Sequence, residues 1–255
     1  MTNVPAFQHP RLLGVSLKMY MDRARTRQWL SDVATLARRG ETDGVELFVI
    51  PDFLSLDAAS RILEGTQVRL GAQDVFWEDS GAYTGEISAP MLAQTGCRYV
   101  EVGHAERRRL FGETDAITAA KAAAAARAGL IPVICIGESE RVDPQLAVDF
   151  CERQLKEVFA QMPIYAPLVL AYEPVWAIGA AKPAEPDYIR AVSHGLRLLL
   201  ADRPARLIYG GSAGPGLFTR LQNAVDGLFL GRFAHNPAAL AAVLAELRGI
   251  EATSA

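Results

Sequence analysis

Short runs of apolar residues recur along the chain, and each is followed by a longer segment with helical spacing. Several runs are continuous rather than alternating, such as residues 47–50 and 133–136, which is typical of parallel strands covered on their outer face. The pattern predicts strands at residues 12–17, 45–50, 68–72, 98–102, 131–136, 168–172, 206–208 and 227–230. No Pro-, Gly- or Ser-rich linker separates these units, so we expect a single domain over residues 1–255.

The segments between the predicted strands carry the helical period. Helices are expected at residues 26–39, 114–127, 147–159, 187–200 and 237–247. Thr114 can cap the second of these helices, and Gly129 can terminate it. Eight strand–helix units in 255 residues predict an α/β fold in which the strands close into a (β/α)8 barrel. A doubly wound open sheet is the alternative.

The composition restricts the kinds of molecule that the protein is expected to bind. Lys and Arg total 26 and Asp and Glu total 29, so the formal net charge is −3, which favours neither nucleic acid nor an anionic membrane surface. Residues 1–10 lack the basic start and apolar core of a secretory signal, and no apolar run is long enough to span a membrane. Three cysteines without a Cys-x-x-Cys pair and four histidines without zinc-like spacing lead us to expect buried reduced thiols, no metal and a cytoplasmic protein.

In such a barrel, the loops at the carboxyl ends of the strands carry the chemistry. Glu173 follows one predicted strand and precedes the apolar run 174–179. Burial beside Trp176 and Ile178 would raise the pKa of Glu173, as a general base requires. A loop as apolar as residues 174–179 is typical of a lid that closes over a substrate. The alternative is a solvated glutamate before an ordinary loop.

Two further strand ends carry candidate groups. His104 lies between a predicted strand and the start of a helix, where the positive helix end disfavours imidazolium and keeps the ring a neutral donor. Only four of the 26 basic residues are lysines, so Lys18 at the end of the first strand favours a compact ammonium group. A structural histidine and compositional chance are the respective alternatives.

The last two predicted strands are followed by glycine-rich turns, at residues 209–212 and 230–232. Such turns can direct backbone N–H groups toward a phosphate, although tight turns also need glycine without any ligand. The Gly-x-Gly-x-x-Gly and P-loop patterns of nucleotide sites are absent from the chain.

Taken together, six blocks resemble the triosephosphate isomerase family, in the family's order and over nearly the whole chain. They are GAQ at 71–73, GAYTGEIS at 81–88, GHAERR at 103–108, CIGE at 135–138, AYEPVWAIG at 171–179 and YGGS at 209–212. The resemblance implies a single TIM barrel that acts, without a cofactor, as an aldose–ketose isomerase on a short sugar phosphate.

The resemblance also implies roles. Glu173 would carry a proton between adjacent carbons through an enediol(ate), His104 would polarise the carbonyl oxygens as a neutral imidazole, and Lys18 would stabilise developing negative charge. Glu106 would orient Lys18.

Binding and assembly roles follow from the same resemblance. Backbone N–H groups of Gly179, Ser212 and Gly231 would bind the phosphate. Residues 174–184 would form the lid, with Pro174, Val175, Trp176, Ala177, Ile178 and Lys182 among them. Thr84, Gly85 and Glu86 would belong to a loop that enters a partner subunit, which implies a homodimer.

The chain departs from the family's pattern at several positions. Ser16 stands where the family's Asn-x-Lys has Asn, which leaves space, and Ala105 removes the serine hydroxyl that can hold the base. Ala181 replaces a lid glycine and stiffens the hinge. Arg232 replaces the second glycine of the last Gly-Gly pair, where its guanidinium either points to solvent or adds a donor to the substrate.

Ser16 and the Gly231-Arg232 pair resemble the branch of the family that isomerises erythrulose phosphates in erythritol and threitol catabolism. We therefore expect a four-carbon substrate, with L-erythrulose 1-phosphate converted to D-erythrulose 4-phosphate. The conversion of D-glyceraldehyde 3-phosphate to dihydroxyacetone phosphate is the alternative. A barrel that binds phosphorylated metabolites without turnover is a third hypothesis, which Glu173, His104 and Lys18 disfavour because binding alone needs no positioned base.

Overall fold

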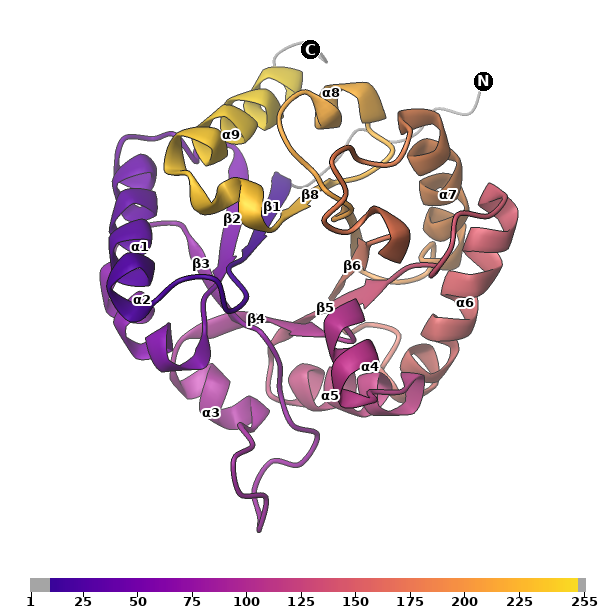
Figure 1. Cartoon of the computed structure of the whole chain (residues 1–255). Coiled ribbons are helices and arrows are strands. Elements are labelled where there is room, and N and C mark those ends of the chain that lie inside the picture. The colour runs from indigo at the N-terminus through magenta and orange to yellow at the C-terminus, as the bar shows by residue number, and fades with distance from the viewer. Residues whose placement is uncertain (1–9, 252–255) are drawn as a thin grey trace.

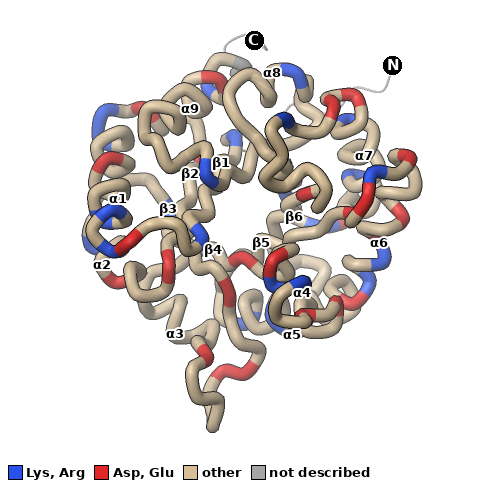
Figure 2. Tube along the Cα trace, in the orientation of Figure 1, with Lys and Arg blue, Asp and Glu red and all other residues tan. Residues whose placement is uncertain are grey.

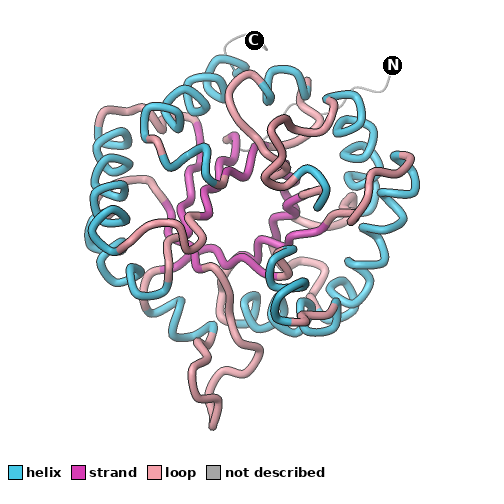
Figure 3. The backbone as a smooth tube through the Cα atoms, viewed as in Figure 1, coloured by secondary structure: helices cyan, strands magenta, loops and turns pink. Residues whose placement is uncertain are grey.

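The computed structural model describes residues 10–251 and shows a closed barrel of parallel strands (Figures 1 and 3). The strands are β1 (Arg11–Ser16), β2 (Val45–Ile50), β3 (Arg69–Ala72), β4 (Cys97–Val102), β5 (Ile131–Ile136), β6 (Leu168–Tyr172), β7 (Ala205–Tyr209) and β8 (Gly227–Leu230). Each strand pairs with the next, and β8 pairs with β1. The barrel prediction is confirmed and the open-sheet alternative is wrong. Residues 1–9 and 252–255, which include most of the segment assessed as a secretory signal and both ends of the predicted domain, lie outside the described residues.

Helices surround the ring of strands (Figure 3). They are α1 (Arg23–Arg38), α2 (Leu56–Ile62), α3 (Ala89–Gln94), α4 (Ala105–Phe111), α5 (Asp115–Arg127), α6 (Pro144–Gln161), α7 (Pro186–Leu199), α8 (Leu217–Leu221) and α9 (Pro237–Glu251), with 3-10 turns η1 (Phe53–Ser55), η2 (Val175–Ala177) and η3 (Arg232–His235). The side chain of Thr114 accepts a hydrogen bond from the N–H of Ile117 at 3.2 Å, and Gly129 has φ +76°. Both predicted ends of α5 are thus confirmed.

The core has two layers because residues on both faces of each strand are buried. Inside the barrel, side chains such as Leu12, Phe48, Tyr99 and Phe229 pack together, and the rings of Phe48 and Tyr99 stack with centroids 4.4 Å apart. The outward-facing side chains pack against the helices. This double burial explains the continuous apolar runs in the sequence.

Acidic and basic positions are interspersed over the outer helices (Figure 2), in keeping with the small net charge. In residues 10–251 no helix combines the length and apolar character needed to cross a membrane. Cys97, Cys135 and Cys151 are buried free thiols, as predicted. Between β3 and α3, the loop of residues 73–88 projects away from the barrel (Figure 1).

Candidate active site

The carboxyl ends of β1, β4 and β6 bring three ionisable side chains into one cluster. His104 Nε2 lies 3.6 Å from Glu173 Oε2. Lys18 Nζ donates a hydrogen bond of 2.8 Å to Glu106 Oε1, and the other oxygen of Glu106 lies 3.6 Å from His104 Nδ1. Glu106 therefore joins Lys18 to His104, and residues 18, 104 and 173 converge although they are far apart in the sequence.

His104 is the residue that caps the first turn of α4. Its Nδ1 accepts a hydrogen bond from the backbone N–H of Glu106 at 3.2 Å, which leaves the ring proton on Nε2, the atom that faces Glu173. Burial, together with the charge of Lys18, lowers the pKa of His104 to about 4. Near neutral pH the ring is thus an uncharged N–H donor, as the sequence predicts.

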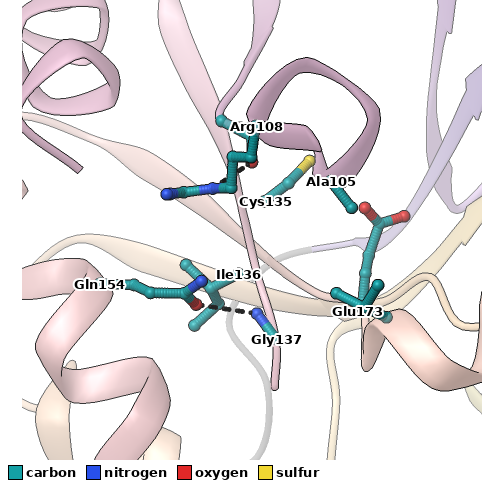
Figure 4. A pocket seen from close by; sticks show the side chains of 9 residues that line it. Ala105, Arg108, Cys135, Ile136, Gly137, Gln154 and Glu173 are labelled. Atoms are coloured by element: carbon teal, nitrogen blue, oxygen red, sulfur yellow. Dashed lines mark hydrogen bonds between the residues drawn. The ribbon is translucent and has the colours of Figure 1, made fainter. Parts of the chain in front are cut away.

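Glu173 follows β6 directly, and its carboxyl group is buried. A Cβ atom on Gly210 would lie 2.4 Å from Glu173 Oε1, so only glycine at 210 leaves room for the carboxyl group in this position. Figure 4 shows the same carboxyl group beside Ala105, at a small cavity that Cys135 also lines. Among the described residues, Glu173 Oε2 has no hydrogen-bond partner, as expected where alanine replaces the family's serine.

Desolvation determines the proton affinity of Glu173. Burial raises its pKa to about 7, and the positive charge of Lys18 opposes part of that increase. A carboxyl group in this state is ionised in a large fraction of molecules near neutral pH and is a stronger base than a solvated glutamate. The Glu173 carboxyl group is therefore suited to removing a proton from carbon.

Lys18 is held in a strained backbone conformation, with φ +50°. The side-chain amide of Gln73 donates a hydrogen bond of 2.8 Å to the Lys18 carbonyl oxygen, which helps to hold this turn. Burial alone would lower the pKa of Lys18, but the hydrogen bond to Glu106 and the surrounding carboxylates raise it overall. The ammonium group stays charged inside the site. In the sequence, Gln73 belonged to the block at 71–73, and nothing there indicated this contact.

The predicted lid is anchored through Glu138. Its carboxylate accepts hydrogen bonds from Trp176 Nε1 at 2.8 Å and from the hydroxyl groups of Tyr172 and Tyr188 at 3.1 and 2.9 Å. Trp176 belongs to η2, Tyr172 to β6 and Tyr188 to α7. One buried acceptor thus connects the lid's first half to the barrel and to an outer helix.

The lid is buried at both ends, at Pro174 and Ala184, and is exposed over residues 179–182. Pro174 and Ala177 are buried, Ile178 is half-buried, and Val175 and Lys182 are exposed. At the far end, the backbone N–H of Ala184 donates to the hydroxyl oxygen of Tyr209 at 3.2 Å.

The glycine-rich turns after β7 and β8 both reach the lid. Ser212 Oγ donates to the carbonyl oxygen of Ala177 at 2.8 Å, and a Cβ atom on Gly179 would lie 3.8 Å from Arg232 Nη2. Within residues 10–251, the backbone N–H groups of Gly179, Ser212 and Gly231 donate to no protein atom. The structure therefore brings together the residues predicted to bind phosphate and leaves their donors unused by the protein.

Arg232 is exposed, and its guanidinium lies over the ring of Tyr20, 5.6 Å from the centroid. Its proximity to Gly179 shows that the side chain lies against the lid. Thr84, Gly85 and Glu86 lie in the projecting loop 73–88 and are exposed. They do not belong to the cluster.

Sequence patterning missed Glu101. Ser16 Oγ donates a hydrogen bond of 2.8 Å to Glu101 Oε2, so Ser16 contacts a buried carboxyl group within the barrel. The available signal was a charged residue within the apolar part of the strand, since Tyr99, Val100 and Val102 flank it.

The site combines a buried carboxyl group, a neutral imidazole and an ammonium group on the rim of a (β/α)8 barrel. This arrangement is the one expected of an isomerase that works by acid–base catalysis on this fold. The chain belongs to the triosephosphate isomerase family, because the family model described as Triosephosphate isomerase matches residues 11–247.

Individual relatives carry two different names. The chain is 48% identical, over 92% of its length and 94% of the relative's, to the L-erythrulose-1-phosphate isomerase of Pectobacterium atrosepticum. It is 39% identical to the protein of the same name from Mesorhizobium japonicum, over 87% and 91% of the two chains. Identity to the triosephosphate isomerase of Symbiobacterium thermophilum is 38%, over 92% and 95%. The protein is thus a sugar-phosphate isomerase, of the enzyme class of the aldose–ketose isomerases.

We expect kcat/KM to rise with pH through about 7, because burial raises the pKa of Glu173 to that value and only its ionised form accepts a proton from carbon. His104 does not contribute in this range, since its pKa is lowered to about 4. The measurement is kcat/KM against pH, with the substrate phosphate titrated separately by phosphorus NMR. A profile with no enzyme inflection near pH 7 contradicts the assignment.

Shortening the base should damage turnover more than binding. In Glu173→Asp the carboxylate is withdrawn from the reacting carbon by about one methylene, so we expect kcat to fall about 100-fold or more with KM changed little. Steady-state kinetics measure both constants, and the melting temperature of the variant checks its fold. Comparable losses in kcat and KM would argue against Glu173 as the base.

Proposed function

We propose that this protein interconverts L-erythrulose 1-phosphate and D-erythrulose 4-phosphate. The observation that carries the proposal is Ser16 on β1, which turns to Glu101 and is shorter than the asparagine that the family has at this position. The shorter side chain would leave room for one more hydroxymethyl group. The 48% identity to an L-erythrulose-1-phosphate isomerase supports the same substrate.

The reaction moves the carbonyl group from C2 to C3 of the sugar. Glu173 takes the proton from C3 while the Nε2–H of His104 donates a hydrogen bond to the carbonyl oxygen, and the electron pair of the broken C–H bond forms an enediolate. The C2 oxygen takes the Nε2 proton of His104, and His104 recovers a proton from the C3 hydroxyl group. Glu173 then returns its proton to C2, so the carbonyl group ends on C3. Both isomers are ketoses, and the same proton transfer in a triose phosphate links an aldose to a ketose.

The charge that develops on the substrate oxygens is stabilised by Lys18, which Glu106 orients. A preorganised ammonium group in a buried site stabilises such charge far more than one in water. His104 remains neutral, so it provides a hydrogen bond without adding a second positive charge.

The substrate phosphate binds where the lid meets the last two strand-end turns. The N–H groups of Gly179, Ser212 and Gly231, which donate to no protein atom among the described residues, belong to the lid and to these two turns. The Arg232 guanidinium beside Gly179 adds a charged donor. Closure of residues 174–184 over the phosphate would exclude water from the enediolate.

A homodimer is the assembly we propose. Exposed apolar side chains follow three neighbouring strands: Met19 after β1, Leu54 after β2 and Tyr83 after β3. The base of the projecting loop is fixed, because the buried ammonium of Lys121 donates to both oxygens of Asp74 at 2.7 Å. A rigid projecting loop beside apolar surface favours docking into a second copy. The buried free thiols favour a reducing, cytoplasmic location.

Triosephosphate isomerase activity is the second candidate. The 38% identity to a protein of that name over 92% of the chain supports it, and the cluster of Lys18, His104 and Glu173 serves both reactions equally. Each tetrulose phosphate carries one more hydroxymethyl group than the corresponding triose phosphate, at the end of the chain that lies farthest from the phosphate.

The decisive comparison is kcat/KM for L-erythrulose 1-phosphate against kcat/KM for D-glyceraldehyde 3-phosphate on the same preparation. We expect the tetrulose phosphate to be preferred by about tenfold or more, since a site shaped for one extra carbon gains roughly 1–3 kcal/mol from filling it. A clear preference for the triose phosphate overturns the four-carbon proposal and leaves the second candidate. Absence of deuterium exchange from solvent into both sugars would refute the assigned proton-transfer mechanism.

The assembly is tested by light scattering coupled to size-exclusion chromatography. We expect a molar mass of twice 27.6 kDa. We expect Tyr83→Asp to shift the population toward the single chain, because burying an unpaired charge at the interface is strongly destabilising. Lys156→Asp on α6 is the matched surface control. A single-chain mass for the unaltered protein at micromolar concentration refutes the dimer.

A further inference from the structure

Glu101 is a buried carboxyl group that the mechanism above does not use. It lies on β4, two residues after Tyr99, and alternate residues of a strand face the same side. Tyr99 packs inside the barrel, so Glu101 faces the interior one level nearer the rim. Its exposed fraction is 3%. It therefore forms part of the floor beneath the cluster of His104 and Glu173.

The two carboxyl oxygens of Glu101 have unequal surroundings. Oε2 accepts the 2.8 Å hydrogen bond from Ser16 Oγ. Oε1 lies 3.9 Å from His104 Nε2 and 3.9 Å from Cys135 Sγ, and a thiol is a weak donor. Among the described residues Oε1 thus has no hydrogen bond of ordinary length to nitrogen or oxygen, which is costly for a buried polar atom.

Burial also sets the charge of Glu101. It raises the pKa of this carboxyl group to about 8, and the neighbouring Glu173 raises it further while Ser16 opposes the increase. Near neutral pH the group is mainly protonated, so it offers both an O–H donor and a carbonyl acceptor. A neutral carboxyl group is well suited to pairing with a hydroxyl group.

The position of Oε1 relates it to the substrate. His104 Nε2, the proposed donor to the carbonyl oxygen, lies 3.6 Å from Glu173 Oε2 and 3.9 Å from Glu101 Oε1. In the closed ring, β4 lies opposite β8, and Gly231 of the proposed phosphate site follows β8. A sugar phosphate that reaches from the phosphate site to His104 therefore directs its far end toward β4, where Glu101 lies.

We propose that Glu101, held by Ser16, is a specificity-determining residue that hydrogen-bonds the terminal hydroxyl group of a four-carbon substrate. This inference rests on the proposed function. In L-erythrulose 1-phosphate the terminal hydroxyl is on C4, and a triose phosphate has no equivalent carbon. Glu101 therefore contributes to turnover of the tetrulose phosphate and contributes little to turnover of the triose phosphate.

The experiment removes the contact from both sides. On the substrate side, 4-deoxy-L-erythrulose 1-phosphate lacks only the terminal hydroxyl, and we expect its kcat/KM with the unaltered enzyme to be about 10- to 100-fold lower than that of the parent sugar. On the protein side, Glu101→Leu should lower kcat/KM for the parent sugar by a similar factor, with little change for D-glyceraldehyde 3-phosphate. In Glu101→Leu the deoxy sugar should show no further loss.

Two variants distinguish the proposed hydrogen bond from a purely structural effect of the substitution. Glu101→Gln keeps a donor and an acceptor and should stay within about threefold of the unaltered enzyme for both sugars. Tyr99→Phe removes a buried hydroxyl from the same face of β4, where Tyr99 donates to Glu46 at 2.5 Å. That matched control should leave the ratio of the two kcat/KM values unchanged.

Each failure has a distinct signature. No turnover of the tetrulose phosphate by the unaltered enzyme overturns the proposed function and this inference with it. Turnover of the parent and deoxy sugars at equal kcat/KM overturns the inference alone, and this comparison needs no folded variant. Equal losses for three- and four-carbon substrates in Glu101→Leu also overturn it.

Discussion

Desolvation of carboxyl groups at one rim of the barrel is the constraint from which the chemistry follows. Parallel closure brings the ends of β1, β4 and β6 to the same rim, and burial of Glu173 there raises its pKa to about 7. The chain accommodates this group rather than neutralising it: Gly210 leaves room for the carboxyl group, and Ala105 offers no hydroxyl to bind it. Lys18 is close enough to moderate the cost and is itself occupied by Glu106.

The same constraint extends to the lid and to the floor. Glu138 gathers three hydrogen-bond donors, one of them from the lid, so the position of Trp176 is set by the packing of β6 and α7. Below the rim, Glu101 is a second buried carboxyl group, and its pKa rises to about 8 partly because Glu173 is near. Near neutral pH Glu173 is therefore ionised in a larger fraction of molecules than Glu101, so Glu173 is the better proton acceptor and Glu101 the better hydrogen-bond donor.

Much of this arrangement was predictable because a parallel barrel gives strand ends a shared location. Apolar runs located the strands, and Lys18, His104 and Glu173 were candidates because they follow those runs. The helices α2, α3 and α8 were missed because five to seven residues are too few to display a helical period.

Contacts between distant strands were beyond sequence patterning. Lys18 adopts a left-handed conformation that non-glycine residues rarely occupy, and Gln73, fifty-five positions away, helps to hold it there. The Ser16–Glu101 pair joins β1 and β4, which are not neighbours in the ring, so the two side chains meet only inside the closed barrel. The charge of Glu101 within a buried strand was visible, but its partner was not.

The central claim is that Lys18, His104 and Glu173 act together on one small anion. The most direct measurement is a crystal structure of the protein with phosphoglycolohydroxamate or a four-carbon analogue of the enediolate. The account predicts that all three side chains contact the same ligand, with its phosphate on the N–H groups of Gly179, Ser212 and Gly231. A ligand bound elsewhere, or one that contacts only one of the three side chains, would contradict it.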